Sequence, residues 1–144
     1  MTDLGKDNPG IRDLIAEAAT IAKEKGWDKT EGTNYAASVA ATLMLIVSEA
    51  SEALEVIREG HEPWEVWYAH PIEGLTTTVP LHTSDNTGDE PKPPKPEGYG
   101  VELADICIRV FHEASRRDID LPKLIVEKME YNRTRPHRHG GKTL

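Results

Sequence analysis

The chain has 144 residues, of which 38% are hydrophobic and 29% are charged, and its formal net charge is −8. This composition is typical of a single globular domain (1–144). The negative charge argues against a nucleic-acid polymer as partner, and the single cysteine excludes an internal disulfide. No uninterrupted apolar segment approaches the roughly 20 residues that cross a bilayer and the N-terminus does not resemble a signal peptide, so we expect a cytoplasmic protein with no membrane partner.

Apolar residues recur at helical spacing in the first part of the chain and predict two helices. The first covers about residues 10–25, and Gly26 supplies its stop. The second is the longest element and covers about residues 33–59, with Thr33 as the predicted N-cap and Gly60 at the C-terminal boundary.

Two further helices are predicted in the last third of the chain. The third follows Gly98 and Gly100 and ends near residue 117. The fourth begins within residues 120–122, where a proline suits the first helical turn, and runs towards Pro136.

The segment between the second and third helices, residues 61–98, is predicted to be a long loop. Its last part, "DEPKPPKPEG", is rich in prolines, which cannot continue a helix and favour an extended linker. A short β-hairpin from "LTTTVPLHT" (75–83) is weakly indicated, because a proline interrupts it. A loop of this length is either functional or disordered.

Each long helix has a predicted core face. In the second helix this face consists of Leu43, Ile46, Val47, Ala50, Leu54 and Ile57. In the third helix it consists of Leu103, Ile106, Cys107, Val110, Phe111 and Ala114. Cys107 is therefore expected to be a buried small hydrophobe.

Two carboxylates lie within the apolar second helix. Glu49 and Glu52 are one turn apart, and the residues four positions after them are Ala53 and Val56 rather than lysines or arginines. Carboxylates in such surroundings repel each other and take up protons unless a cation neutralises them.

The third helix repeats this arrangement with Glu102 and Asp105, again three positions apart. Two facing helices would bring the four carboxylates together, and oxygen ligands are those that Mg²⁺ or Mn²⁺ prefers. The alternative is that both pairs are ordinary solvent-exposed acids that form no site. A ferritin-like di-iron site is disfavoured, because no histidine has an acid three residues before it.

Basic and aromatic residues are the candidates for substrate binding. Lys128 and Asn132 share a helix face with Arg135 nearby, and Lys142 lies in the glycine-containing C-terminal segment. Such groups can donate to phosphate, although a solvated basic helix end would look the same. Trp64 or Trp67 could stack on a base, although most tryptophans simply pack.

Three segments in order resemble one enzyme family. The segments are "SEASE", "ELAD" and "KMEYNRTRPHRHGGK". Together they resemble the motifs of the MazG-like, all-α nucleoside triphosphate pyrophosphatases, especially phage-type members. The resemblance covers residues 42–142 apart from the long loop.

The resemblance implies an all-α, four-helix bundle and a Mg²⁺-dependent hydrolase that converts a nucleoside triphosphate into the monophosphate and pyrophosphate. Its metal ligands would be Glu49, Glu52, Glu102 and Asp105. Among these four, Glu49 is our choice for the general base that accepts the proton of the attacking water. There are two departures from the family pattern. Ser48 stands where the motif usually has its first glutamate, and the 61–98 segment is an insertion.

The second helix carries the small-residue segment "YAASVAATL", which permits close approach of helices. We therefore expect a homodimer or homotetramer. The alternative function is a non-catalytic helical module that binds nucleotides or a protein partner.

Overall fold

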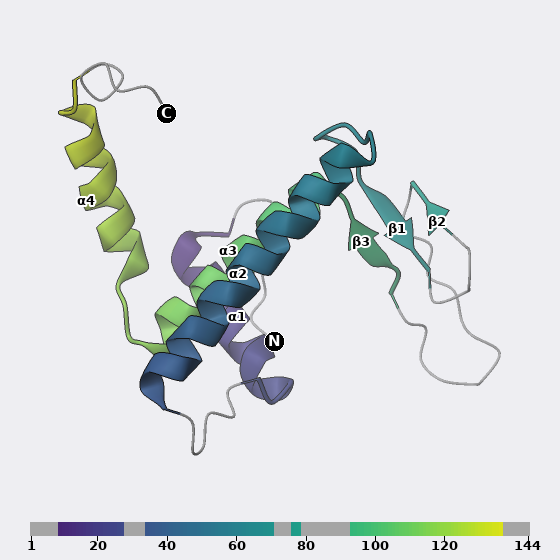
Figure 1. Cartoon of the computed structure of the whole chain (residues 1–144). Coiled ribbons are helices and arrows are strands. Elements are labelled where there is room, and N and C mark those ends of the chain that lie inside the picture. Colours follow the sequence, from purple (N-terminus) through teal and green to yellow (C-terminus); the bar gives the residue numbers. More distant parts are fainter. Residues whose placement is uncertain (1–8, 28–33, 71–75, 79–92, 137–144) are drawn as a thin grey trace. The chain divides into compact units, whose positions relative to one another are not determined.

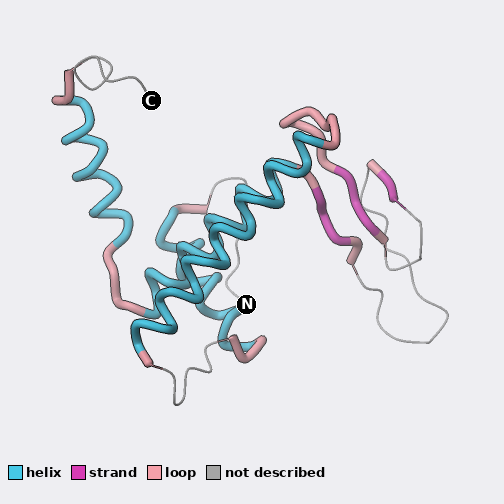
Figure 2. The backbone as a smooth tube through the Cα atoms, viewed as in Figure 1, coloured by secondary structure: helices cyan, strands magenta, loops and turns pink. Residues whose placement is uncertain are grey.

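The structure is a computed structural model that describes residues 9–27, 34–70, 76–78 and 93–136. Its helices are α1 (Ile11–Glu24), α2 (Tyr35–Arg58), α3 (Tyr99–Arg116) and α4 (Leu121–Arg133), and its strands are β1 (Trp67–Ala69), β2 (Thr76–Thr77) and β3 (Lys95–Glu97) (Figures 1 and 2). The expectation of an all-α fold is confirmed in its coarse form, because the described residues are mostly helical with one small sheet, while the four-helix bundle stays a prediction.

The chain divides into two compact units. The terminal unit comprises residues 1–29 and 111–144, and the central unit comprises residues 30–110. The boundary between the two units falls within α3.

In the terminal unit, α1 buries its alanine face through Ala18 and Ala22. The side chain of Arg12 forms an ion pair of 3.1 Å with Asp120, which is the N-cap of α4. Asp120 also accepts a hydrogen bond from the backbone N–H of Lys123 at 3.3 Å, as expected for an N-cap. The two helices lie where the sequence predicted them, although α4 ends at Arg133 rather than nearer Pro136.

In the central unit, the N-cap of α2 lies one residue later than predicted. Asn34 is the N-cap, and its side chain accepts a hydrogen bond from the backbone N–H of Ala36 at 2.9 Å. Thr33 lies outside the described residues. At the other end, Gly60 has a φ of 92°, which suits a glycine after the last helical turn.

The insertion contributes a three-stranded antiparallel sheet in the order β2-β1-β3. Tyr68 in the central strand pairs with Thr77 on one side and with Pro96 on the other. Pro96 lacks an N–H group, which is tolerated because β3 is an edge strand. The extended segment expected around Thr76 is present, but its described partner is β1, and residues 79–83 of the predicted hairpin lie outside the described residues.

Gly98 connects the sheet to α3. Its φ is 135°, and a Cβ atom at this position would lie 2.4 Å from the carbonyl oxygen of Glu65. Only glycine permits both this backbone conformation and this close approach. The residues around the start of β1 are therefore packed tightly against the residue that precedes α3.

The predicted core face of α2 is wrong. Leu43, Val47 and Leu54 are between 52% and 56% exposed, whereas Glu49 and Ala53 on the other face are 6% and 4% exposed. Periodicity identifies the residues that share a face, but it does not say which face meets another element of the same chain.

The third helix departs from its predicted core face in the same way. Leu103 is 42% exposed, and Cys107, which we expected to be buried, is also exposed. Ala114 of the predicted face is buried. The residue that α3 buries in its first turn is instead an acid, Glu102.

Within the described residues, α2 is long and apolar enough to cross a bilayer by length and composition alone. This finding qualifies the conclusion from sequence that no segment reaches that length, and only 11% of the apolar window is buried within the structure. Its C-terminal half carries Glu49, Glu52 and Glu55, and carboxylates are costly in hydrocarbon. The absence of a membrane partner stays a prediction.

Candidate metal centre

Helices α2 and α3 bring three of the four predicted metal ligands together. Carboxylate oxygens of Glu49, Glu102 and Asp105 all lie within 4.8 Å of one another. Glu49 and Glu102 are buried, with 6% and 5% of their surface exposed, and Asp105 is partly buried. The i,i+3 spacing on α3 places Glu102 and Asp105 on one face of that helix. Glu49 lies on the buried face of α2, close to both of them.

The fourth predicted ligand, Glu52, lies beside this triad rather than within it. Its side chain is exposed and accepts a hydrogen bond from the hydroxyl of Ser48 at 3.3 Å. Glu52 and Glu102 line a cavity of about 340 Å³, together with Ser48 and Ser51. The residue that departs from the family pattern, Ser48, is thus in contact with a predicted ligand.

Arg109 is a member of the site that the sequence reasoning missed. Its Nε donates a hydrogen bond of 2.6 Å to Oε1 of Glu49, and its Nη2 forms an ion pair with the same oxygen. The i,i+4 rule applied to Glu49 covers only basic partners on its own helix. A usable signal was present, because Arg109 follows Asp105 by four positions and therefore shares its face of α3.

Glu102 and Asp105, the other two acids of the triad, lie in surroundings that disfavour their charged forms. Burial is the largest cause that raises the pKa of Glu102, followed by repulsion from Glu52, Asp105 and Glu49. Burial and repulsion from Glu49 likewise raise the pKa of Asp105, against the opposing charge of Arg109. The site thus contains more carboxylates than basic side chains that could neutralise them.

Lys95 of β3 is the second basic residue near the acids that sequence reasoning did not single out. Its Nζ forms an ion pair of 2.9 Å with Glu97, and this hydrogen bond is the largest cause that raises the pKa of Lys95. The more distant charges of Glu102 and Glu52 act in the same direction. The insertion therefore contributes a cation that interacts electrostatically with the acidic cluster.

The donor set fits a divalent cation. Three carboxylate oxygens at this mutual separation are hard ligands of the type that Mg²⁺ and Mn²⁺ bind, and the adjoining cavity leaves room for water or phosphate oxygens. A bound cation would also remove the repulsion that raises the pKa values of Glu102 and Asp105.

The predicted phosphate-binding residues lie in the terminal unit. Lys128, Asn132 and Arg135 are exposed, and the ammonium of Lys128 lies 4.9 Å from the centre of the Tyr131 ring. Lys142 is outside the described residues. The part that these residues play in binding substrate stays a prediction.

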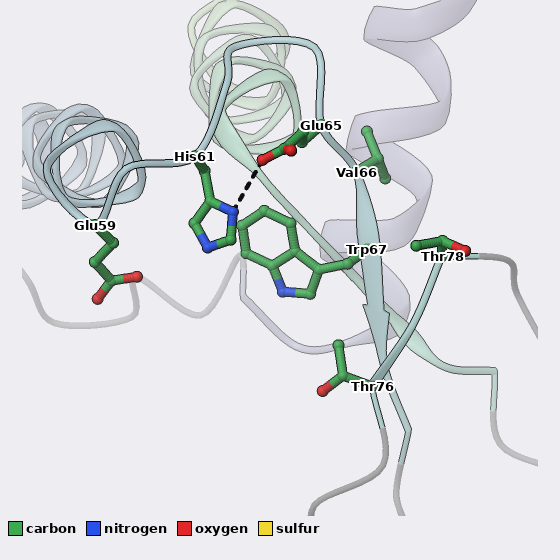
Figure 3. Close-up of a pocket in the computed structure, with 7 residues that line it drawn as sticks. All are labelled: Glu59, His61, Glu65, Val66, Trp67, Thr76 and Thr78. Atoms are coloured by element: carbon green, nitrogen blue, oxygen red, sulfur yellow. Dashed lines mark hydrogen bonds and ion pairs between the residues drawn. The ribbon is translucent and has the colours of Figure 1, made fainter.

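The tryptophan that lies beside the acids is Trp67 rather than Trp64. Trp64 is 77% exposed, and it lines neither this cavity nor the second one described here. Trp67 and Glu59 line both the 340 Å³ cavity and a neighbouring cavity of about 510 Å³ in the insertion (Figure 3). Sequence reasoning could not separate the two tryptophans, because their surroundings depend on the sheet.

No protein-family model, curated protein or solved structure matches this chain. The resemblance to MazG-like pyrophosphatases therefore depends on the three sequence segments alone.

Proposed function

We propose that this protein is a Mg²⁺-dependent nucleoside triphosphate pyrophosphohydrolase of the MazG-like type, which releases a nucleoside monophosphate and pyrophosphate. The observation that carries the proposal is the meeting of Glu49 from α2 with Glu102 and Asp105 from α3. Mn²⁺ could substitute for Mg²⁺ at such oxygen ligands.

The charges of the site support the proposal. Four acids, namely Glu49, Glu52, Glu102 and Asp105, share this part of the central unit with the guanidinium of Arg109. Buried carboxylates with raised pKa values and too few cations are surroundings in which a divalent metal binds favourably.

The cavity beside the acids supports phosphate chemistry. A divalent cation bound there would supply Lewis-acid stabilisation of phosphate oxygens and a water of lowered pKa. Glu49 is our candidate to accept the proton of the attacking water, because the hydrogen bond from Arg109 holds its carboxylate in place within the triad. Lys128, Asn132, Arg135 and Lys142 are the candidates that neutralise the substrate phosphates, on the strength of the family resemblance.

We also propose that the active form is a helical bundle made from more than one copy of the chain. The apolar face of α2 supports this part of the proposal, because Leu43, Val47 and Leu54 are more than half exposed. Monomeric soluble proteins rarely leave contiguous apolar surface uncovered.

A non-catalytic nucleotide-binding module is the second candidate. The ion pair between Arg109 and Glu49 favours it, because an arginine that occupies a ligand can replace a metal rather than assist one. The serine at position 48, in place of the usual glutamate, points in the same direction.

The two candidates differ in turnover. We expect one or more nucleoside triphosphates to yield monophosphate and pyrophosphate in the presence of Mg²⁺, and none to do so in chelator. In ¹⁸O-labelled water the label should appear in the monophosphate, because water attacks the α-phosphorus. Asp105→Asn should reduce kcat at least a hundredfold, and Glu127→Gln, which alters an exposed acid on α4, should leave kcat unchanged.

Release of orthophosphate from the γ-position would exclude this reaction. Nucleotide binding without turnover of any standard nucleoside triphosphate would favour the binding module, and Ser48→Glu would then be the first variant in which to look for restored activity.

A further inference from the structure

The larger of the two cavities described here lies in the insertion. It has a volume of about 510 Å³ and is lined by Glu59, His61, Glu65, Trp67, Thr76 and Thr78 (Figure 3). This volume is within the range of small-molecule sites. Every one of these residues belongs to the end of α2 or to the segment that the family resemblance leaves unexplained.

An aromatic pair forms one wall of this cavity. The rings of His61 and Trp67 are stacked, with centroids 4.3 Å apart and an angle of 24° between their planes. Nδ1 of His61 lies 3.0 Å from a carboxylate oxygen of Glu65, as the dashed line in Figure 3 shows. The stack thus has a fixed orientation, and a flat ring can pack against it without ordering these side chains.

Glu65 is itself held in place by the backbone. Its carboxylate accepts a hydrogen bond of 3.0 Å from the backbone N–H of Glu62. This bond is the largest cause that lowers the pKa of Glu65, and the hydrogen bond from His61 is the second. An ionised Glu65 accepts a hydrogen bond from the Nδ1–H group of His61, so Nε2 of His61 is left for other contacts. The backbone of Glu65 is also fixed by the close approach of Gly98.

The polar groups of the cavity suit the edge of a nucleobase. The hydroxyls of Thr76 and Thr78 can donate or accept, and the carboxylate of Glu59 can accept from ring or exocyclic N–H groups. Glu59 makes no side-chain hydrogen bond or ion pair with any residue in the described part of the chain. An aromatic wall with a few polar groups is typical of sites that bind a heterocycle.

The two cavities are adjacent, because Glu59 and Trp67 line both. The smaller cavity also contains Glu52 and Glu102 of the acidic cluster. A ligand that spans the two cavities would have an aromatic ring at one end and metal-bound phosphates at the other, which is the chemistry of a nucleotide.

We propose that the insertion cavity binds the nucleobase of the substrate against the His61–Trp67 stack, and that the insertion therefore determines base preference. This inference rests on the proposed function, since that function places the phosphates at the acidic cluster.

The test reads out binding separately from turnover. In the metal-free protein, a nucleoside monophosphate should shift the indole N–H resonance of Trp67 in a saturable manner, whereas ribose 5-phosphate, which lacks a base, should not. Trp67→Phe identifies that resonance by its disappearance. If nucleoside monophosphates leave the Trp67 resonance unchanged at saturating concentration, the inference is overturned.

Enzyme kinetics provide a second test of the base site. Trp67→Leu should raise KM for the preferred nucleoside triphosphate at least tenfold, Trp67→Phe should recover most of the loss, and Trp64→Leu, which alters a tryptophan outside both cavities, should have no effect. Turnover that is insensitive to Trp67→Leu would overturn the base site while leaving the proposed function intact. A Trp67 shift without turnover would support the base site and contradict the hydrolase.

Discussion

Arg109 changes the interpretation of the acidic cluster at the scale of single residues. The side chain of Arg109 is 37% exposed, whereas the side chain of Glu49, to which it is bound, is 8% exposed. A carboxylate with that burial needs a cation, and in the absence of metal Arg109 is the cation that touches it. Arg109 therefore stabilises the metal-free fold, and it would compete with a bound cation for the carboxylate of Glu49.

Replacing Arg109 should separate these two effects. In chelator, Arg109→Met should lower the free energy of unfolding by about 2 kcal/mol, or the melting temperature by roughly 5 °C, because Glu49 is left buried beside two other acids. Mn²⁺ should restore more of the melting temperature of this variant than it adds to the parent protein, since the metal then supplies the missing charge.

Arg58→Met is the matched control for this experiment. Arg58 forms an ion pair of 2.8 Å with Glu55 on the same helix, but both side chains are more than half exposed. Its loss should change stability by less than about 0.5 kcal/mol. Equal melting temperatures of Arg109→Met and the parent in chelator would show that the buried ion pair contributes nothing to stability.

At the scale of elements, the small sheet positions the start of α3. Residues of β1 and of the loop before it meet Gly98, which directly precedes the helix that carries Glu102 and Asp105. Because the backbone of Gly98 lies against Glu65, a displacement of the sheet would displace the first turn of α3. The insertion therefore supports the acidic cluster as well as forming the larger cavity.

Gly98→Ala tests this coupling. The substitution combines an unfavourable positive φ with a Cβ atom 2.4 Å from the Glu65 carbonyl oxygen, so we expect a loss of at least about 2 kcal/mol in unfolding free energy. The loss is measured by thermal or denaturant unfolding in chelator, where metal binding does not contribute.

Gly100→Ala is the control in the same helix turn. A Cβ atom at Gly100 would meet no neighbouring side chain or loop within 4 Å, and alanine has the higher helix propensity, so stability should stay equal or rise by up to about 1 kcal/mol. If Gly98→Ala unfolds at the temperature of the parent, the sheet does not hold the start of α3.

At the scale of the whole molecule, α2 presents an extensive apolar surface. Its exposed large hydrophobic residues are Tyr35, Leu43, Met44, Leu45, Val47, Leu54 and Ile57. The same helix buries Glu49 and Ala53 on its other face. A second copy of the chain would cover this surface and give α2 a helix partner on both faces.

We therefore predict that the protein is a homodimer or homotetramer in solution, as measured by sedimentation velocity or light scattering. Leu43→Lys should weaken self-association at least tenfold, because it places a charge in the apolar interface. Ser115→Lys adds the same charge at an exposed polar position of α3 and should leave association unchanged. A parent protein that stays monomeric at high micromolar concentration would contradict the prediction.

The positions of the helices follow from local sequence. Apolar periodicity, capping residues and terminal glycines placed all four predicted helices within a few residues of their observed bounds. These signals are local, since a cap or a helical turn involves residues three or four positions apart. The i,i+3 spacing of Glu102 and Asp105 belongs to the same class, and so the sequence alone places both acids on one face.

Which face of a helix meets which neighbour was decided only by the tertiary structure. The sequence assigned Leu43 and Val47 to the core, yet the fold buries Glu49 instead and joins it to Arg109, 60 positions further along the chain. Trp67 and not Trp64 lines the cavities for the same reason, because strand pairing sets its position. Such contacts between distant residues leave no periodic signal in either segment, so local patterns predict the elements but not their partners.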